Sequence, residues 1–276
     1  MRFTWLGHSS VVLDLDGVRV LTDPLLRPHA GLLRRLAPRP DPASWSRPDA
    51  VLLSHLHHDH AELRSLRMLE GAALMSAPEN VAWLRRRRLT DTVPLGDGWT
   101  AAPAPAEDPA GNPTSNPSGS PVRARVEVRQ VPAEHRHRPM PHRPNAAHGH
   151  LVRGPSGTVW FAGDTGLFPG MAAMSALAGG PIDVAVVPVW GWGPRLSAGH
   201  LNPETAARAV ALSGARFAIP VHWGTLHPPL VTRFARSWLE LPGERFARAV
   251  ADQAPGCTAV ILAPGGSWAA PAGSGP

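Results

Sequence analysis

Alternating apolar and polar residues begin almost at the first position of the chain. In the segments RFTWLG (2–7) and SVVLDLDGVRVLTDP (10–24), apolar and polar side chains alternate, which is typical of strands with one buried face. The pair Asp16-Gly17 divides the longer segment and is a two-residue hairpin signal. The opening of the chain is therefore predicted to form antiparallel strands.

Short apolar strands and segments of helical periodicity follow along both halves of the chain. Strands are expected at residues 49–55, 123–131, 157–166, 182–189, 215–225 and 258–264, and helices at 61–71, 78–89, 171–177, 203–213 and within 230–250. Polar residues collect at the ends of the strands. This pattern predicts an α/β fold in which helices cover the outer sides of two sheets.

One segment has no periodicity. Residues 103–121 are mostly Pro, Gly, Ser, Ala and Asn, so they are predicted to be a low-complexity surface loop inserted between two strands. A domain boundary there is the alternative, but strand-like alternation resumes directly afterwards. We therefore expect a single domain over residues 1–264 and a disordered tail over residues 265–276.

Composition narrows the range of partners. The 276 residues have a formal net charge of +6, and all 27 basic residues are arginine. Basic patches interleaved with aromatic residues, which bind single-stranded nucleic acid, are missing from the sequence, so no nucleic-acid partner is expected. The run Arg85–Arg88 spreads around a helix and makes no single basic face.

The sequence also lacks the features of a secreted or membrane-spanning protein. No apolar run approaches the roughly 20 residues that span a bilayer, and the N-terminus carries no signal-peptide pattern. We expect a cytoplasmic protein without stable membrane insertion; its oligomeric state is left open. The single cysteine, Cys257, has no second thiol, so any metal must be bound by nitrogen and oxygen.

Four histidines and an aspartate lie within six positions of VLLSHLHHDHAEL (51–63), directly behind an apolar run. Because side chains alternate along an extended segment, His55 and His57 are expected to point the same way, with Asp59 and His60 in the turn that follows. Imidazoles and carboxylates are zinc ligands. Four of them exceed what one tetrahedral ion uses once distant residues contribute, which indicates two ions. Two cations that share a water molecule lower its pKa, so that hydroxide exists at neutral pH.

The pattern His-x-His-x-Asp-His resembles the metal-binding motif of the metallo-β-lactamase superfamily, whose fold is an αββα sandwich. Other motifs follow that family's order: the opening hairpin, VPAEHRHR (131–138), FAGDTG (161–166) and IPVHWGT (219–225). The resemblance implies seven ligands of two Zn²⁺ ions: His55, His57 and His135 in one set, Asp59, His60 and His222 in the other, and Asp164 bridging them. Mn²⁺ and Fe²⁺ tolerate the same donors.

Some histidines allow more than one interpretation. His137 is the alternative to His135 as third ligand, and His58 is expected to face away from the ligands. His8 and His200 resemble family positions near the site. For His8 a structural hydrogen bond is at least as strong an interpretation, and for His200 a role as acid or substrate contact stands beside a hydrogen bond to a ligand. The candidate catalytic residues are Asp59, Asp164 and His200.

Two further groups of residues have structural interpretations. His142, His148 and His150 occur in a Pro-rich segment that is expected to be a mobile loop; a segment that overhangs the pocket is the alternative. Trp190 and Trp192 lie between glycines after a strand and are expected either to line the pocket or to pack against a neighbouring loop.

Details of the motifs are most similar to the branch that contains N-acylphosphatidylethanolamine-hydrolysing phospholipase D and L-ascorbate-6-phosphate lactonase. This resemblance implies hydrolysis of a phosphodiester or a phosphorylated lactone, in a small molecule or a lipid. The alternatives are a general ester or lactone hydrolase and a metal-binding sensor without turnover. RNA processing is disfavoured because the family's ribonucleases add an exosite arm or a domain. A diiron flavoprotein role would need a flavin domain for which the chain has no room.

Overall fold

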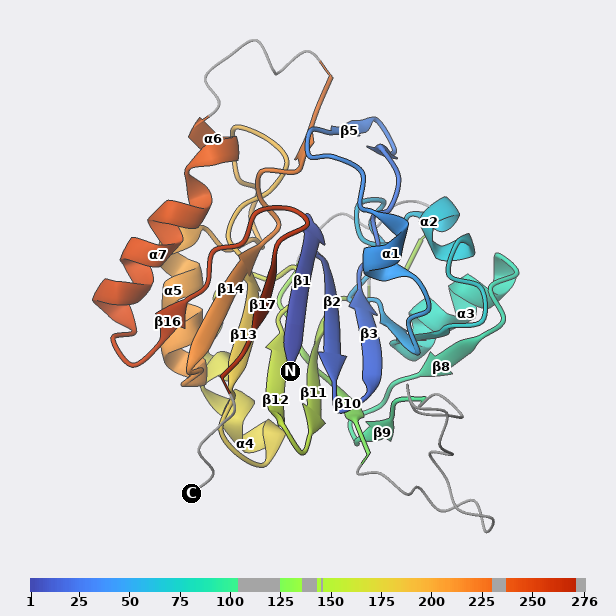
Figure 1. Cartoon of the computed structure of the whole chain (residues 1–276), viewed down its shortest axis with the longest axis horizontal. Helices are drawn as coiled ribbons and strands as arrows, with labels where there is room; N and C mark the ends of the chain where they lie inside the picture. Colours follow the sequence, from blue (N-terminus) through green and yellow to red (C-terminus); the bar gives the residue numbers. More distant parts are fainter. Residues whose placement is uncertain (104–124, 136–142, 145, 230–236, 272–276) are drawn as a thin grey trace.

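The computed structural model describes residues 1–103, 125–135, 143–144, 146–229 and 237–271, and two seven-stranded sheets lie at its centre (Figure 1). In spatial order the first sheet contains β17 (Ser267–Ala269), β1 (Arg2–Gly7), β2 (Ser10–Leu15), β3 (Val18–Thr22), β6 (Ala50–Leu52), β7 (Ala73–Ser76) and β8 (Thr92–Pro94). Strands β17 to β3 pair antiparallel, and β3 to β8 pair parallel.

The second sheet has the same mixed character. In spatial order it contains β16 (Thr258–Ala259), β14 (Phe217–Val221), β13 (Val184–Pro188), β12 (Gly157–Phe161), β11 (His148–Gly154), β10 (Glu127–Pro132) and β9 (Thr100–Ala101). Strands β9 to β12 pair antiparallel, and β12 to β16 pair parallel. A small third sheet is formed by β15 (Leu226–His227), β5 (Leu33–Arg35) and β4 (His29–Ala30).

Helices cover the outer sides of the two large sheets (Figure 1). They are α1 (Pro42–Trp45), α2 (Leu63–Arg67), α3 (Pro78–Arg86), the 3₁₀ helix η1 (Pro169–Ala173), α4 (Met174–Ala178), α5 (Pro203–Ser213), α6 (Ser237–Glu240) and α7 (Pro242–Gln253). Within the described part of the chain, none of them combines the length and the apolarity that a bilayer crossing requires.

Alternate side chains of the strands supply separate apolar layers. Along β13, Val184 and Val186 belong to the layer between the two sheets, whereas Ala185 and Val187 pack with α5 and α7 on the outer side. Trp83 of α3 belongs to a third layer, outside the first sheet. Three apolar layers separate four layers of structure, which confirms the predicted αββα sandwich.

Local sequence signals account for several element boundaries. Asp16 and Gly17 have positive φ values of 49° and 85° and connect β2 to β3, as a two-residue hairpin requires. Helix α5 spans the residues predicted for it. The Asn202 side chain accepts the backbone N–H of Thr205 at its start, and Gly214 ends it with a φ of 68°.

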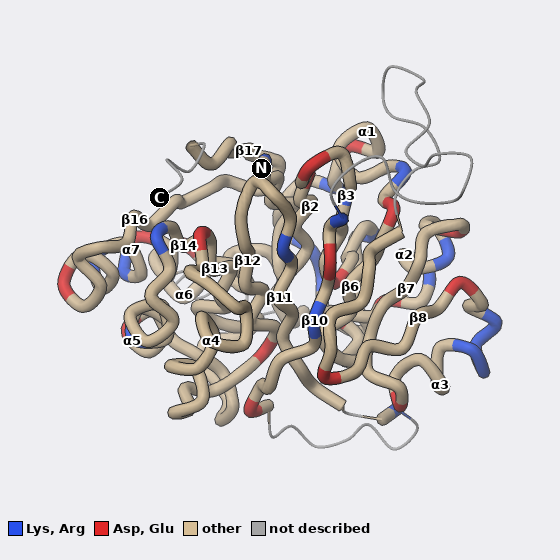
Figure 2. Tube along the Cα trace, turned by 90° about the horizontal axis from the view of Figure 1, so that it is seen from below, with Lys and Arg blue, Asp and Glu red and all other residues tan. Residues whose placement is uncertain are grey.

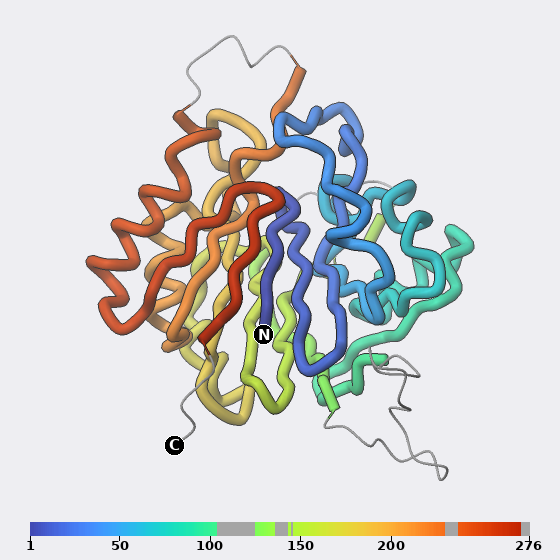
Figure 3. The backbone as a smooth tube through the Cα atoms, in the orientation of Figure 1, coloured from blue at the N-terminus to red at the C-terminus, as the bar shows by residue number. Residues whose placement is uncertain are grey.

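The expectation of a disordered tail from Gly265 is wrong for residues 267–269. These residues form β17, which lies beside β1 although the two strands come from opposite ends of the chain (Figure 3). The ring of Trp268 stacks on Phe3, with 5.9 Å between the ring centroids. The pairing joins residues that are 263 positions apart, as in the hydroxyl contact of Thr4 with Ser267, so no local pattern reveals it.

Other predicted segments are shorter than expected or lie outside the described residues. Of the strand expected at 258–264, only β16 pairs with a neighbour, and α2 and α3 end before the predicted helices do. The low-complexity segment 103–121 lies outside the described residues except for residue 103. The last five residues of the expected tail, 272–276, are also outside the described residues.

Candidate metal centre

The predicted metal ligands come together at one end of the two sheets. Strand β6 ends at Leu52, and a tight turn follows in which the N–H groups of His60 and Ala61 both donate to the carbonyl of His57, at 3.1 and 2.8 Å. This turn lies beside the residues that follow β1, β10, β12 and β14, which hold the remaining ligands predicted or considered from the sequence (Figure 1).

His55, His57 and His135 form the first donor set. Nδ1 of His57 lies 2.8 Å from Nε2 of His55 and 3.2 Å from Nε2 of His135. Nitrogens that bind one tetrahedral zinc ion at roughly 2.0–2.1 Å are separated by about 3.3 Å, so the spacing suits a single ion. The structure thus places His135 where the sequence predicts the third ligand; the alternative, His137, lies outside the described residues.

Asp59, His60 and His222 form the second donor set, and His8 joins it. The Nε2 atoms of His60 and His222 are 3.2 Å apart, and each lies 3.7 Å from Oδ2 of Asp59. Nε2 of His8 is 3.0 Å from the same oxygen. His8 was interpreted either as a residue near the site or as a structural hydrogen-bonding residue. In the structure it lies beside the site and forms a hydrogen bond with Asp59.

Oδ2 of Asp164 lies between the two sets. It is 3.9 Å from Nε2 of His55 in the first set, and 3.1 and 3.2 Å from Nε2 of His60 and His222 in the second. Oδ1 of Asp164 is buried and has no hydrogen-bond partner among the described residues. A buried carboxylate oxygen without a donor, surrounded by imidazole nitrogens, fits a site for cations.

Hydrogen bonds behind the imidazoles determine which nitrogen faces the cluster. Nδ1 of His135 and Nδ1 of His222 each donate to a backbone carbonyl, at 3.1 and 2.8 Å. Nδ1 of His60 donates to Oδ2 of Asp23 at 2.9 Å. Because carbonyl and carboxylate oxygens only accept, Nδ1 carries a hydrogen in all three rings, which leaves Nε2 to face the cluster, where it could bind a cation.

Asp23 and Ser54 connect the two sets from behind, and the sequence interpretation missed both residues. The Ser54 hydroxyl donates to Oδ2 of Asp23 at 2.6 Å and accepts from Nδ1 of His55 at 3.0 Å. The same Asp23 oxygen accepts from His60, so one hydrogen-bonded chain reaches both donor sets. The available signal was an aspartate directly after β3. Its φ of 34° is uncommon for a residue other than glycine and is often found at functional sites.

The two donor sets differ in charge. Burial lowers the pKa of His57 to about 4, so this first-set imidazole is neutral at pH 7. Burial opposes a charge on His222 as well, but the Asp164 carboxylate outweighs it and raises the pKa of His222 to about 9. Burial is likewise outweighed at His60, where Asp164 and Asp59 raise the pKa well above its ordinary value. A cation that binds the second set must therefore displace protons.

His200 lies at the edge of the cluster. Its Nε2 is 3.5 Å from Oδ2 of Asp164, and its Nδ1 is 3.0 Å from the Ser197 hydroxyl. The ring centroid is 4.9 Å from that of His135. His58, in contrast, is half-buried and belongs to none of the donor groups found among the described residues.

The expectation of a mobile loop is wrong for His148 and His150. Both are buried on β11, a strand that was not among the expected strands and that pairs with β10 and β12. His142 lies outside the described residues. Trp190 donates its indole N–H to a backbone carbonyl in its own loop at 2.9 Å, whereas Trp192 is 41% exposed.

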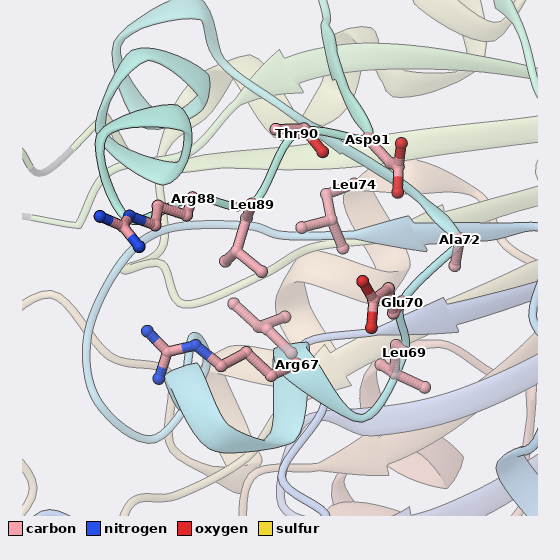
Figure 4. A pocket seen from close by; sticks show the side chains of 10 residues that line it. Arg67, Leu69, Glu70, Ala72, Leu74, Arg88, Leu89, Thr90 and Asp91 are labelled. Atoms are coloured by element: carbon pink, nitrogen blue, oxygen red, sulfur yellow. The ribbon is translucent and has the colours of Figure 1, made fainter.

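A separate cavity of about 260 Å³ opens on the outer side of the first sheet and contains none of the predicted ligands. Arg67 and Arg88 lie on one side of it, Glu70 and Asp91 on the other, and leucines between them (Figure 4). The end of α3 is at the periphery of the molecule (Figure 2), and the run Arg85–Arg88, which continues beyond the helix, is exposed. The clustered donor atoms, and not this cavity, form the candidate functional site.

Comparison with known proteins agrees with this geometry. Residues 18–223 match the family model described as a beta-lactamase superfamily domain. The chain belongs to the metallo-β-lactamase superfamily. It is 30% identical over 273 residues to a protein named UPF0173 metal-dependent hydrolase MK1542 from Methanopyrus kandleri, covering 97% of this chain and 99% of that protein.

The chain is also 27% identical to N-acyl-phosphatidylethanolamine-hydrolyzing phospholipase D 1 of Caenorhabditis elegans. That alignment covers 80% of this chain and 63% of the nematode protein.

Solved structures show the same fold at lower sequence identity. The metallo hydrolase Igni18 from Ignicoccus hospitalis matches with a TM-score of 0.67 and 20% identity, covering 97% of each chain. An isothiocyanate hydrolase from Delia radicum gut bacteria matches with a TM-score of 0.67 and 16% identity, covering 98% of this chain and 99% of the other. At these identities the likeness shows a shared fold alone.

Proposed function

We propose that the chain is a metal-dependent hydrolase with a binuclear centre, acting on a phosphodiester or a phosphorylated lactone in a small molecule or lipid. The proposed ligands are His55, His57 and His135 for one ion, Asp59, His60 and His222 for the other, and Asp164 for both. The position of Asp164 carries the proposal, because its Oδ2 lies within 3.9 Å of Nε2 atoms from both sets. The similarity to a metal-dependent hydrolase along nearly the whole chain supports it.

Zinc bound at these sets would lower the pKa of its water ligand to about 7 and polarise an oxygen of the substrate. The chain itself supplies two ionised carboxylates there. Burial opposes ionisation of Asp164, but the His222 and His60 imidazoles hold its pKa well below the usual range. Burial opposes ionisation of Asp59 in the same way, and His60 is the main group that holds its pKa low. Both carboxylates can therefore accept a hydrogen bond and orient an attacking water.

His200 is the proposed contact to the substrate or acid toward the leaving group. Its ring centroid lies 4.9 Å from that of His135 and 5.8 Å from that of His222, so it borders both donor sets. Its side chain is 8% exposed, whereas the His55 and His60 side chains are fully buried. A bound substrate would thus meet His200 before it meets the deeper rings.

The charge around the site favours an anionic substrate. Residues 24–40 contain four arginines and no acidic residue. Within this segment the β4–β5 hairpin lies at the end of the molecule that holds the metal centre (Figure 1). Arg34 and Arg39 are exposed there, and positive charge near a site raises the local concentration of phosphate-bearing molecules. The similarity to a phospholipase D is a further reason to propose a phosphodiester.

Metal analysis followed by turnover assays tests this proposal. The protein is reconstituted with Zn²⁺, Mn²⁺ or Fe²⁺ and assayed with bis-p-nitrophenyl phosphate, a phosphorylated lactone and p-nitrophenyl esters. We expect two bound ions per chain and faster hydrolysis of the phosphodiester or the phosphorylated lactone than of the neutral esters. A preference for neutral esters would favour a general ester or lactone hydrolase. Two bound ions without turnover of any substrate would favour a metal sensor.

Asp164→Ala is the decisive variant. We expect it to lower kcat by roughly 100-fold or more and to weaken the binding of one ion, because the carboxylate contacts both donor sets. The matched control is His58→Gln, which changes a neighbouring histidine of the same turn outside the donor groups and should keep both properties. Full activity and unchanged metal content in Asp164→Ala would contradict the assignment.

A further inference from the structure

A small cavity lies behind the metal centre, between the two sheets. It has a volume of about 20 Å³, and the polar residues that line it are Ser9, Thr22, Asp23, Ser54 and His150. Every side chain of the lining is buried. A water molecule needs a cavity volume of roughly 10–15 Å³ and two to four polar partners. The cavity therefore has the volume and the polar groups to hold one water molecule.

His150 brings an unsatisfied nitrogen to this cavity. Its side chain lines the cavity and is only 2% exposed, and its Nε2 has no hydrogen-bond partner among the described residues. Buried polar atoms in folded proteins are nearly always paired, with protein or with ordered water. An ordered water in the cavity is a partner that fits this nitrogen.

Asp23 and Ser54, which also line the cavity, belong to the hydrogen-bonded chain behind the two donor sets. Oδ1 of Asp23 accepts the backbone N–H of Ser54 at 2.8 Å, and its Oδ2 accepts from the Ser54 hydroxyl and from His60. Each carboxylate oxygen has about two acceptor sites, so Asp23 can take a further donor. A water in the cavity can give one hydrogen to Asp23 and pair with His150 on its other side.

We propose that this cavity binds one ordered water molecule that bridges Nε2 of His150 to the Asp23–Ser54 pair, which makes His150 a positioning residue for the metal ligands His60 and His55. The proposal rests on the proposed ligand roles of these two histidines. The bridge holds the Asp23 carboxylate against the ring of His60 and the Ser54 hydroxyl against that of His55. Partners of this kind fix the orientation of the ligand ring.

His150→Leu removes the polar contact and keeps an apolar side chain of similar reach. We expect it to weaken the binding of at least one zinc ion by roughly 3- to 10-fold, less than the 10- to 100-fold effect typical of losing a direct partner of a ligand. His150→Gln, which keeps a polar tip, should restore the affinity. Zinc affinities are measured by competition with a chromophoric chelator, so the result does not depend on turnover.

His148→Leu is the matched control. His148 is also buried, lies on the same face of β11 with its ring centroid 4.7 Å from that of His150, and does not line the cavity. Its replacement should leave the zinc affinities unchanged. Wild-type affinity in His150→Leu, or equal losses in both leucine variants, would overturn the proposal, because the effect would then be absent or a matter of general packing.

A crystal structure of the zinc-loaded wild type, at a resolution that shows ordered water, gives a second test that needs no variant to fold. We expect one water within hydrogen-bonding distance of His150 Nε2 and of Asp23 or Ser54. An empty cavity, or a water that contacts only one wall, would refute the bridge. Absence of turnover would contradict the proposed hydrolase but not the water bridge. Absence of the bridging water would contradict the bridge but not the proposed hydrolase.

Discussion

The carboxylate of Asp23 contacts residues behind both donor sets, a role that its place in the sequence does not indicate. The seven predicted ligands lie close together in the structure. They could be predicted because the motif in the His55–His60 turn has a recognisable spacing and because His135, Asp164 and His222 each follow a strand. Asp23 follows a strand as well, but an aspartate before a proline is also an ordinary turn signal. Its role depends on the parallel pairing of β3 with β6, which places it beside Ser54 and His60.

Asp23→Asn is expected to weaken zinc binding by roughly 10- to 100-fold at constant fold, because the neutral amide is a poorer acceptor for the His60 Nδ1–H. The affinity is measured by chelator competition, and the fold by far-UV circular dichroism. Asp49→Asn is the control, since Asp49 accepts the backbone N–H of Arg19 at 2.7 Å away from the cluster. Equal zinc affinities in the two variants would show that Asp23 has no part in metal binding.

Elements with strong local signals could be predicted, and elements held by distant partners could not. Helix α5 has its cap residues next to it in the sequence, so both of its ends were predictable. The β4–β5 hairpin and β17 are two or three residues long and pair with strands far away along the chain. So few residues show no periodicity, and their pairing is decided by tertiary contacts.

Trp268→Ala tests whether β17 belongs to the folded sheet. We expect a loss of about 2 kcal/mol in the free energy of unfolding, below the 3–5 kcal/mol typical of fully buried aromatics, because this half-buried ring packs on Phe3 and Phe217. Urea denaturation measures it. Trp192→Ala makes the same change at an exposed position and should shift stability by less than about 0.5 kcal/mol. A frayed β17 would make the two variants indistinguishable.

At the scale of the whole molecule, the sandwich brings both donor sets to the same end of the two sheets. The sets differ in charge, because imidazoles of the second set hold protons that the first set lacks. In the metal-free protein the second set holds protons: His222, with a pKa raised to about 9 from an ordinary 6.5, is charged in the folded state between these values and neutral in the unfolded state. Its contribution to stability is complete below about pH 6.5 and disappears as the pH rises through about 9. A metal ion that binds the second set must expel this proton, so it competes better at higher pH.

The zinc-induced rise in Tm is therefore expected to grow from pH 6.5 to pH 9. Differential scanning fluorimetry of chelator-treated and zinc-loaded protein at constant free zinc measures it. His222→Ala should reduce this pH dependence without abolishing it, because His60 still holds a proton that the metal must displace, whereas His58→Gln should retain it in full. A rise in Tm that is constant over this range would mean that the second set is already free of protons in the metal-free protein.

The separation of the donors along the chain also has a consequence during synthesis. His60 and His222, whose Nε2 atoms are 3.2 Å apart after folding, are separated by 162 positions in the sequence. At roughly 5–20 residues per second, a ribosome needs about 8–30 s to pass from one to the other. When translation passes the His55–His60 turn, three of the seven proposed ligands have yet to be made, so on the proposed ligand set complete metal binding waits until translation has passed His222.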